Sequence, residues 1–197
     1  MARSRIGKDP IALFHRLFAR AVRAKLPLPE AMALATASPG GAPSVRFVLL
    51  KAADERGFTF FTDGRSDKGR DLARNPRAAL VFYWHAIHKQ VRIAGRVERV
   101  SPAEADAYWA TRPRRSRLAA AASVQSAPIA SRNVLAKRWL SLHARYGGRE
   151  VPRPPEWTGY RVVPDAIEIW TRRAHRLHDR DHFARTRTGW RRRLLQP

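Results

Sequence analysis

A run of short apolar segments between residues 31 and 100 constrains the fold of this chain more than any other feature. Each segment has the length and apolar content of a strand, and clusters of Gly, Pro, Asp and Ser separate the segments. The five segments are 31–37, 45–52, 58–62, 78–84 and 90–100. Because strands that follow one another directly tend to pair antiparallel, the pattern predicts an α+β barrel rather than an alternating βαβ sheet.

Helices are predicted around this series of strands. An amphipathic pattern indicates a helix over 9–25, Ser66 is placed as the N-cap of a helix that ends at Arg74, and Ser101-Pro-Ala-Glu104 forms a capping box. Further helical segments are expected at 101–111, from Pro113 through 118–122, and at 128–146. Strands should then return at 157–163, 166–170, 176–185 and 190–195. The 197 residues are therefore expected to form one domain, with 1–8 disordered.

The composition excludes several classes of protein. The chain has no cysteine, which excludes disulfides and thiolate catalysis, and its His, Asp and Glu residues show no metal-binding spacing. No apolar run is long enough to span a membrane, and the N-terminus does not resemble a secretory signal. We therefore expect a cytoplasmic protein. The net charge of +23 comes mainly from 33 Arg dispersed over almost every segment, which favours anionic ligands rather than a dedicated nucleic-acid interface.

The segment from Trp170 to Arg180 is a candidate ligand-binding wall. Arg176, His178 and Arg180 are spaced at period two, so on an extended strand their side chains would share one face. Two guanidinium groups around an imidazole are costly to bury without an anionic or polar partner. The alternative is a solvated edge strand in an arginine-rich protein.

Two further groups of residues are candidates for phosphate binding. Arg46 and Lys51 lie five residues apart, so on one strand they would point to opposite faces and serve two different anions, or simply mark the solvated ends of a core strand. Thr62, Ser66 and Lys68 surround a predicted helix N-terminus, which can cradle a phosphate. The carboxylate of the adjacent Asp67 opposes this interpretation.

A third group surrounds a predicted helical corner. Tyr108, Arg112 and Ser116 recur every four residues, either as a stripe on one helix or, because Pro113 disfavours a straight helix, around a corner between two helices. The amide side chains of Gln90 and Gln125 can each donate to and accept from the edge of a heteroaromatic ring. A basic surface turn is the alternative for the corner.

Taken together, these residues resemble the pyridoxine/pyridoxamine 5′-phosphate oxidase family of flavoproteins. The resemblance extends from about residue 9 to residue 197 and is most specific in the closing Arg-Leu-His-Asp-Arg of 176–180. The residues that carry it are Arg46-Phe-Val-Leu-Leu-Lys51, Phe61-Thr62, Ser66 with Lys68, Asn75-Pro76, Phe82-Tyr-Trp84, Gln90-Val91, Tyr108, Arg112-Pro113, Ser116, Gln125-Ser126, Trp170 and 176–180. The resemblance implies an antiparallel, Greek-key-like FMN-binding split β-barrel with peripheral helices, whose active site is completed by 164–197.

The resemblance also implies roles for individual residues. Arg46 and Lys68 would neutralise the FMN phosphate, and Arg176 and His178 would act catalytically against the substrate ring. The other implied FMN contacts are Phe47, Val48, Leu49, Lys51, Phe61, Thr62, Ser66, Gln90, Gln125, Ser126, Trp170 and Arg180. The implied substrate contacts are Lys51, Tyr108, Arg112, Ser116, Arg176 and His178.

The implied protein is a homodimer with two FMN molecules at the subunit interface and no nucleic-acid or membrane partner. The implied reaction oxidises pyridoxamine or pyridoxine 5′-phosphate to pyridoxal 5′-phosphate, with O2 as acceptor and hydrogen peroxide as by-product. The alternatives are a related oxidase of another reduced aromatic, such as a dihydrophenazine, and a flavin-binding protein without turnover. Asp67, where the family usually has a basic residue, and Phe61, in place of a common tyrosine, depart from the family pattern.

Overall fold

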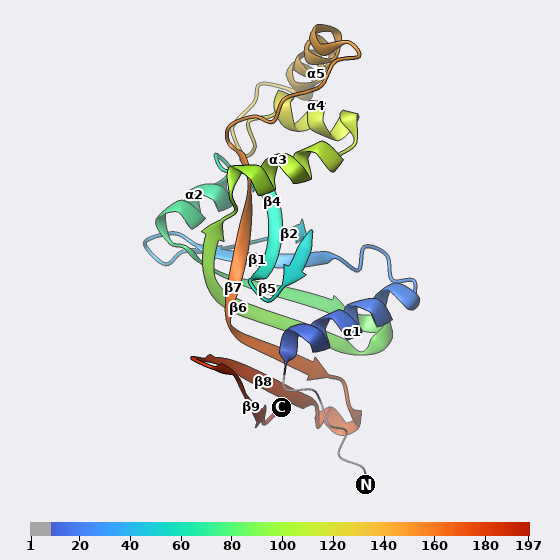
Figure 1. The fold of residues 1–197 in the computed structure, drawn as a ribbon, viewed down its shortest axis with the longest axis vertical. Helices are drawn as coiled ribbons and strands as arrows, with labels where there is room; N and C mark the ends of the chain where they lie inside the picture. Colours follow the sequence, from blue (N-terminus) through green and yellow to red (C-terminus); the bar gives the residue numbers. More distant parts are fainter. Residues whose placement is uncertain (1–8) are drawn as a thin grey trace.

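A computed structural model describes residues 9–197, in which nine strands form one curled antiparallel sheet surrounded by helices (Figure 1). The helices are α1 (Pro10–Arg23), α2 (Asp67–Arg74), α3 (Pro102–Thr111), α4 (Arg114–Ala122) and α5 (Arg132–Tyr146), with short 3-10 turns η1 (His85–Ile87) and η2 (Ala174–Arg176). The strands are β1 (Ala31–Ala37), β2 (Pro43–Leu49), β3 (Ala52–Asp54), β4 (Gly57–Asp63), β5 (Arg77–Trp84), β6 (Lys89–Arg99), β7 (Trp157–Thr171), β8 (Asp179–Thr186) and β9 (Gly189–Leu195). The expectation for residues 1–8 falls outside the described part of the chain.

The order of strands explains where the sheet stays open. It runs β2-β1-β5-β6-β7-β4-β3, and β8 and β9 extend from the other part of β7. After β2 the chain crosses from one edge of this path to the other: the N–H of Leu50 donates to Glu30 O at 2.9 Å, and the N–H of Lys51 donates to Thr59 O at 2.8 Å. The edge strand β2, and β4 with the short edge strand β3 at the other end of the path, thus lie beside the opening, which confirms the expected split barrel.

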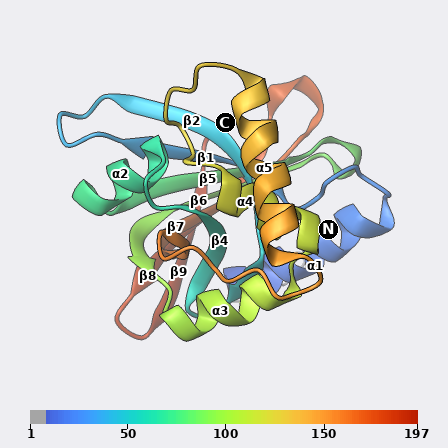
Figure 2. The same cartoon turned by 90° about the horizontal axis from the view of Figure 1, so that it is seen from above.

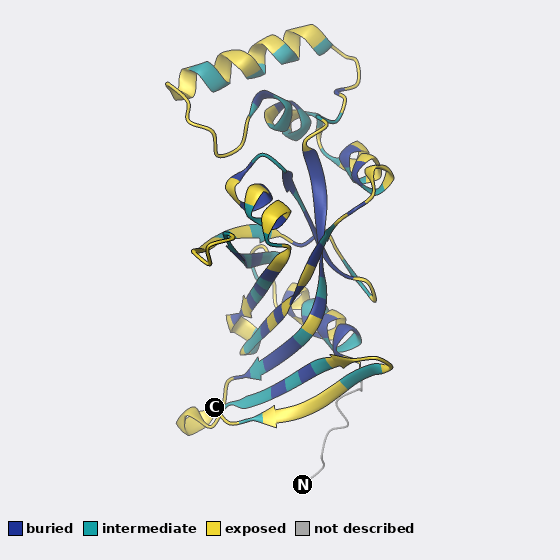
Figure 3. Cartoon of the chain, turned by 90° about the vertical axis from the view of Figure 1, so that its left-hand side faces the viewer, coloured by how far each residue is buried: buried dark blue, intermediate teal, exposed yellow. Residues whose placement is uncertain are grey.

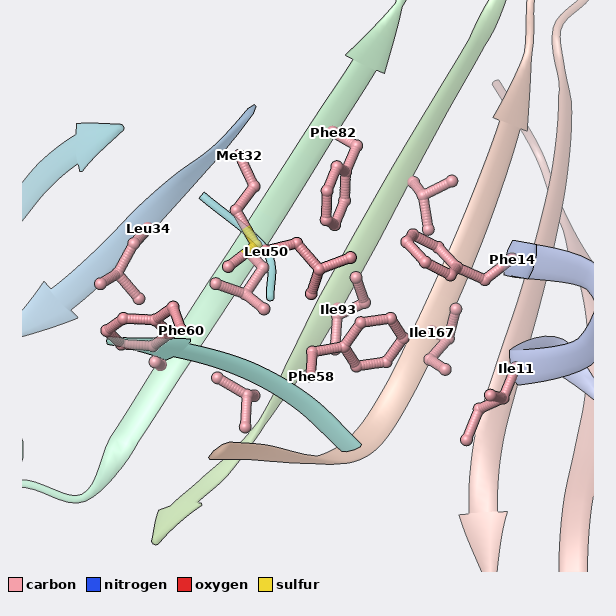
Figure 4. Close-up of a cluster of buried hydrophobic side chains, with 14 of the residues drawn as sticks. Ile11, Phe14, Met32, Leu34, Leu50, Phe58, Phe60, Phe82, Ile93 and Ile167 are labelled. Carbon is pink, nitrogen blue, oxygen red and sulfur yellow. The ribbon is translucent and has the colours of Figure 1, made fainter. Parts of the chain in front are cut away.

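Apolar side chains of alternate strand residues fill the inside of the curl (Figure 4). Met32 and Leu34 of β1 are fully buried, as their period-two spacing predicts. Helix α1 closes one end, where the Phe14 ring lies 4.9 Å from Phe58 and 5.1 Å from Phe82. Burial of an aromatic ring of this size contributes about 2–3 kcal/mol, so this packing fixes α1 against the barrel.

The helices α3, α4 and α5 lie at the opposite end of the molecule from β8 and β9 (Figures 1 and 2). Most of the first half of β7 is buried, whereas no residue of α5 is fully buried (Figure 3). A second apolar cluster, formed by Trp109, Leu118, Val151 and Trp157, joins α3 and α4 to the start of β7. This cluster holds the corner between α3 and α4 in place.

Several local predictions are confirmed. β1 spans the predicted residues, and the Ser66 side chain caps α2 by accepting from the N–H of Gly69. Both hydrogen bonds of the capping box between Ser101 and Glu104 are present at the start of α3. These signals act within a few residues, so the rest of the fold does not override them.

Other boundaries were wrong. The predicted strand 45–52 is divided, because the chain leaves β2 at Leu49 to cross the opening. The predicted break between 163 and 166 is absent: β7 continues through Pro164, which lies at a bulge where Gly95 of β6 approaches Val163 so closely that a Cβ would be 2.0 Å from its carbonyl oxygen. Helix α5 begins at Arg132 rather than at 128.

Candidate active site

A cavity of about 660 Å³ lies at the opening of the barrel, between β2, β4, α2 and the corner of α3 and α4. Its walls contain most of the residues that the sequence singled out. They are Arg46, Phe47, Val48, Leu49, Lys51, Phe61, Thr62, Lys68, Tyr108, Thr111, Arg112, Pro113, Ser116, Gln125 and Trp157. Segments as far apart in the sequence as those of Arg46 and Trp157 therefore meet at one opening.

Lys68 is the buried cation of this cavity. Only 8% of its surface is exposed, and its Nζ donates to Gln125 Oε1 at 3.0 Å, Ser66 Oγ at 3.2 Å and Thr62 Oγ1 at 3.3 Å. All three partners are neutral. Burial lowers the pKa of the Lys68 ammonium below its ordinary value, and the nearby charge of Arg46 lowers it further. A buried ammonium among neutral oxygens is a strong site for an anionic ligand.

Arg46 reaches the same cavity from β2. Its Nη1 donates to Thr36 Oγ1 at 2.7 Å, and its Nη2 donates to Ser44 Oγ at 2.7 Å. The Thr36 hydroxyl in turn donates to Asp71 Oδ2 at 2.6 Å, and Asp71 lies 4.0 Å from the guanidinium. Thr36 and Asp71 therefore orient Arg46. Sequence analysis missed both, because residues 36 and 71 are brought to Arg46 by strand pairing and helix packing that no local pattern encodes.

The N-terminus of α2 forms the next part of the wall. The Ser126 Oγ accepts from the N–H of Asp67 at 3.3 Å, which joins the segment after α4 to the first turn of α2. The Asp67 carboxylate forms an ion pair with Arg70 on the exposed side of the helix. The predicted opposition of Asp67 to an anion is thus reduced, because its charge is paired with a cation. Together with Ser66 and Lys68, the positive end of the α2 dipole makes this part of the wall suited to a phosphate.

The corner between α3 and α4 brings Tyr108, Arg112 and Ser116 to the cavity, as the second of the two sequence interpretations predicted. The Arg112 guanidinium lies 4.6 Å from the centre of the Trp157 ring, and its buried Nη1 has no hydrogen-bond partner within residues 9–197. Burial lowers the pKa of Arg112, although an arginine remains charged. A buried N–H group without a partner is costly, so Arg112 has donor capacity available for a ligand.

Trp157 is a cavity residue that sequence analysis missed. It stacks on Phe61 at 5.3 Å, and Phe61 stacks on Tyr108 at 4.1 Å. In the sequence, its position soon after Val151-Pro-Arg-Pro-Pro155 indicated only the start of the strand predicted at 157–163. The pairing of β4 with β7, which places Asp63 opposite Trp157, brings this ring to the cavity.

Seven predicted residues are not among those that line this cavity. Ser66 and Ser126 lie beside it, where they contact Lys68 and Asp67, and the other five lie on β6, β7, β8 and the loop between β7 and β8. These five are Gln90, Trp170, Arg176, His178 and Arg180. Gln90 is opposite Trp170 in the register of β6 and β7, and Trp170 is opposite Arg180 in that of β7 and β8. Arg180 forms two hydrogen bonds of 3.0 Å with the Glu168 carboxylate. The elements that carry these residues and those that form the cavity lie toward different ends of the chain's fold (Figure 1).

The prediction that Arg176, His178 and Arg180 share one face of a strand was wrong. β8 begins only at Asp179, and Arg176 belongs to η2, where both His175 and Arg176 have positive φ, of 52° and 60°. The His178 ring instead lies 4.5 Å from the Trp170 ring. A second hollow of about 740 Å³ surrounds this loop, lined by His88, Arg172, Arg173, Ala174, His175, Arg176 and His178.

The opposite-face argument for Arg46 and Lys51 was also wrong. Lys51 lies beyond the end of β2, in the segment that crosses the opening, so strand alternation does not apply to it. Both cations line the same cavity. That cavity nevertheless holds two separate groups of cationic side chains: Arg46 with Lys68 beside α2, and Arg112 at the α3–α4 corner.

Two other kinds of site were sought in the described residues. Residues 9–197 contain no cluster of three or more His, Cys, Asp or Glu side chains that could hold a metal ion. In the same part of the chain, no helix combines the length and the apolar character needed to cross a membrane.

The chain is similar to known proteins over nearly its whole length. Residues 18–145 match the family described as "Pyridoxamine 5'-phosphate oxidase", and residues 157–197 match the family described as "Pyridoxine 5'-phosphate oxidase C-terminal dimerisation region". The chain is 54% identical to a pyridoxine/pyridoxamine 5′-phosphate oxidase from Rubrobacter xylanophilus, over 96% of this chain and 87% of that protein. It is 52% identical to the one from Cupriavidus taiwanensis, over 96% of this chain and 90% of the other.

Two solved structures are also similar. PhzG from Burkholderia lata, in complex with tetrahydrophenazine-1-carboxylic acid, superposes with a TM-score of 0.94 and 32% identity, over 100% of this chain and 98% of the other. A pyridoxamine 5′-phosphate oxidase-related, FMN-binding protein from Nostoc punctiforme superposes with a TM-score of 0.75 and 19% identity, over 93% and 97%, which shows the shared fold. On the family matches and the full-length relatives together, the chain belongs to the pyridoxine/pyridoxamine 5′-phosphate oxidase family.

Proposed function

We propose that this protein is an FMN-dependent oxidase that converts pyridoxamine or pyridoxine 5′-phosphate to pyridoxal 5′-phosphate. The observation that carries the proposal is the cationic lining of one cavity, with Arg46 and Lys68 beside α2, Arg112 at the α3–α4 corner and Lys51 in the crossing segment. A cofactor phosphate and a substrate phosphate need two groups of cations within one site. Family membership implies a flavin. The cations beside α2, Arg46 and Lys68, suit a phosphate and therefore favour FMN.

The residues beside α2 fit the FMN phosphate. Lys68 is buried among neutral oxygens, and Arg46 is oriented toward the same space by Thr36 and Asp71. A dianion between the two cations would raise the pKa of Lys68 back toward its ordinary value. The α2 N-terminus adds the positive end of its helix dipole. Riboflavin, which has no phosphate, would leave these groups without a partner.

The residues at the α3–α4 corner fit a second phosphate. Arg112 has a buried N–H group that needs an acceptor, and Tyr108 and Ser116 add hydroxyl groups at the same wall. Lys51 adds a second positive charge from the crossing segment. Stacking on Trp157 fixes the guanidinium plane, so less entropy is lost when a phosphate binds.

We further propose that the site is completed by a second copy of the chain. Gln90, Trp170, Arg176, His178 and Arg180 would then face the cavity of the partner subunit. The match of 157–197 to a dimerisation region supports this arrangement, because that segment carries four of the five residues. The outer face of the sheet supports it as well.

A row of small side chains crosses that outer face, opposite the core. In register from β1 to β8, this alanine row consists of Ala35, Ala79, Ala94, Ala166 and Ala184. At the β2 end, Val45 and Phe47 are 69% and 78% exposed. Flat apolar faces of this kind pack against other proteins. An isologous contact about a two-fold axis would place the β2 end of each copy against the β8 end of the other, which would form two equal sites.

The chain's own residues would orient the substrate and exclude water from the site. None of them would need to act as a strong base. Lys51, Tyr108, Arg112 and Ser116 would anchor the substrate phosphate, while Arg176 and His178 of the partner subunit would hold its ring in place. Bound FMN supplies the electron acceptor, so that oxidation of substrate is coupled to reduction of O2 to hydrogen peroxide. Fixed cations around the site favour negative charge that develops during the reaction.

A second candidate is oxidation of a reduced phenazine ring, favoured by the similarity to PhzG. The cationic group at the α3–α4 corner distinguishes the two functions, because a phenazine carboxylate carries no phosphate. The identity to PhzG, 32%, is also lower than the 54% to the vitamin B6 oxidase of Rubrobacter xylanophilus. We therefore favour the phosphorylated substrate.

The test uses the FMN-loaded protein under anaerobic conditions. Pyridoxamine 5′-phosphate should bleach the flavin absorbance, and readmitted O2 should restore it with formation of hydrogen peroxide. Pyridoxamine without its phosphate should be a far poorer reductant. Bleaching by a dihydrophenazine but not by pyridoxamine 5′-phosphate would support the second candidate, and no bleaching by either would contradict an oxidase.

Substitution of Arg112 tests the corner directly. Arg112→Ala should raise KM for pyridoxamine 5′-phosphate about tenfold to a hundredfold, because a charged hydrogen bond contributes about 1.5–3 kcal/mol. The matched control is Arg115→Ala, since Arg115 is exposed on the same corner. An unchanged KM in Arg112→Ala would remove this residue from the phosphate site.

A further inference from the structure

The connection between β7 and β8, residues 172–178, has an unusual backbone that the proposed function does not explain. Two consecutive non-glycine residues, His175 and Arg176, have positive φ. A non-glycine residue in this conformation is strained and persists only where the surrounding structure determines it. Hydrogen bonds close the loop: the N–H of Leu177 donates to Ala174 O at 3.1 Å, and that of His178 to Arg176 O at 2.9 Å.

Arg173 links the beginning of this loop to its end by two contacts. Its backbone N–H donates to Nδ1 of His178 at 3.1 Å, and its guanidinium Nε donates to Asp179 Oδ2 at 2.7 Å. Asp179 is the first residue of β8 and lies opposite Thr171, the last residue of β7. The ion pair therefore closes the base of the loop, next to the ladder of the sheet.

These contacts determine which nitrogen of His178 carries a proton. A neutral imidazole has one N–H group and one acceptor nitrogen. Because Nδ1 accepts from the Arg173 backbone, the proton of the neutral ring must be on Nε2. The ring also lies 4.5 Å from Trp170, which restricts its rotation.

We propose that Arg173 and Asp179 are positioning residues that fix the orientation of the His178 ring, so that its neutral form is a hydrogen-bond donor through Nε2. This inference rests on the proposed function, in which His178 contacts the substrate. A ring held in this way donates to an electronegative atom of the substrate and does not accept a proton from it. Arg173 and Asp179 act through His178 and need no substrate contact of their own.

The experiment compares Arg173→Ala and Asp179→Asn with the wild type and with Arg172→Ala. Arg172 is the adjacent exposed arginine in the same hollow, and its guanidinium forms no ion pair within residues 9–197. Loss of the ion pair frees the loop, and misplacement of His178 should lower kcat about tenfold with little change in KM. Thermal stability should barely change, because an exposed ion pair contributes little to the free energy of unfolding. Arg172→Ala should behave as the wild type.

A second measurement does not depend on turnover. ¹⁵N NMR of the histidine rings in the FMN-loaded protein, at about pH 8, where ordinary histidine is neutral, should show Nε2–H for His178, assigned with His178→Gln. The two variants should show a mixture of tautomers. Nδ1–H in the wild type, or wild-type kcat in both variants, would overturn the inference. If the wild type does not oxidise pyridoxamine 5′-phosphate, the proposed function fails. The NMR measurement of which His178 nitrogen is protonated would still test this inference.

Discussion

At the scale of single residues, the buried charge of Lys68 makes a prediction about pH. Burial and Arg46 lower its pKa, so the cofactor-free protein loses the Lys68 proton at lower pH than an exposed lysine would. Phosphate binding requires the charged form. FMN affinity should therefore fall several-fold as pH rises from about 7 toward the ordinary lysine value, which fluorescence titration would measure.

Riboflavin is the matched ligand for this prediction, because it has no phosphate and its affinity should not show the same decrease. Lys68→Met should weaken FMN binding by about 1.5–3 kcal/mol and remove most of the pH dependence. Equal pH responses of FMN and riboflavin would mean that Lys68 does not bind the phosphate.

At the scale of elements, the position of α2 depends on a close contact at Gly69. A Cβ at this residue would lie 2.3 Å from the carbonyl oxygen of Gly64, so only glycine lets the first turn of α2 approach this loop. Gly69→Ala should displace the turn that carries Lys68, lower stability by about 1–3 kcal/mol and weaken FMN binding at least about tenfold. Thermal unfolding and FMN titration measure the two effects.

The control for this substitution is Gly148→Ala, after α5, where a Cβ would meet nothing within 4 Å. It should leave both quantities unchanged. Wild-type FMN affinity in Gly69→Ala would show that the α2 N-terminus does not form the phosphate site.

At the scale of the whole molecule, the alanine row predicts how two copies meet. Ala94 is exposed and lies in the middle of the row. Ala94→Glu should place like charges near each other across the two-fold axis, weaken the dimer by at least about 2 kcal/mol and release FMN. Light scattering and flavin content measure these outcomes.

Ala103→Glu is the matched control, since Ala103 is exposed in the first turn of α3, away from the row. It should leave the dimer intact, because a carboxylate near a helix N-terminus is favourable. An Ala94→Glu protein that remains dimeric and retains FMN would contradict the proposed interface.

Local signals in the sequence predicted local structure well. The Ser66 cap, the capping box at Ser101 and the alternation in β1 were all confirmed, because each depends on hydrogen bonds or burial within a few residues. The resemblance to a family correctly placed the chain, and most of its implied residues line one cavity. The strand assigned to Arg176 failed, because a turn with positive φ leaves no signal in an arginine-rich segment.

The sequence by itself determined the class of fold, the family and the chemical types of the site residues. Only the tertiary structure decided that Lys51 shares a cavity with Arg46, that Asp71 orients Arg46, and that Trp170 lies on elements away from that cavity. The physical reason is the range of the interactions. Capping and alternation act over two to four residues, whereas the curl of the sheet, its opening and its uncovered outer face arise only when all the strands have paired.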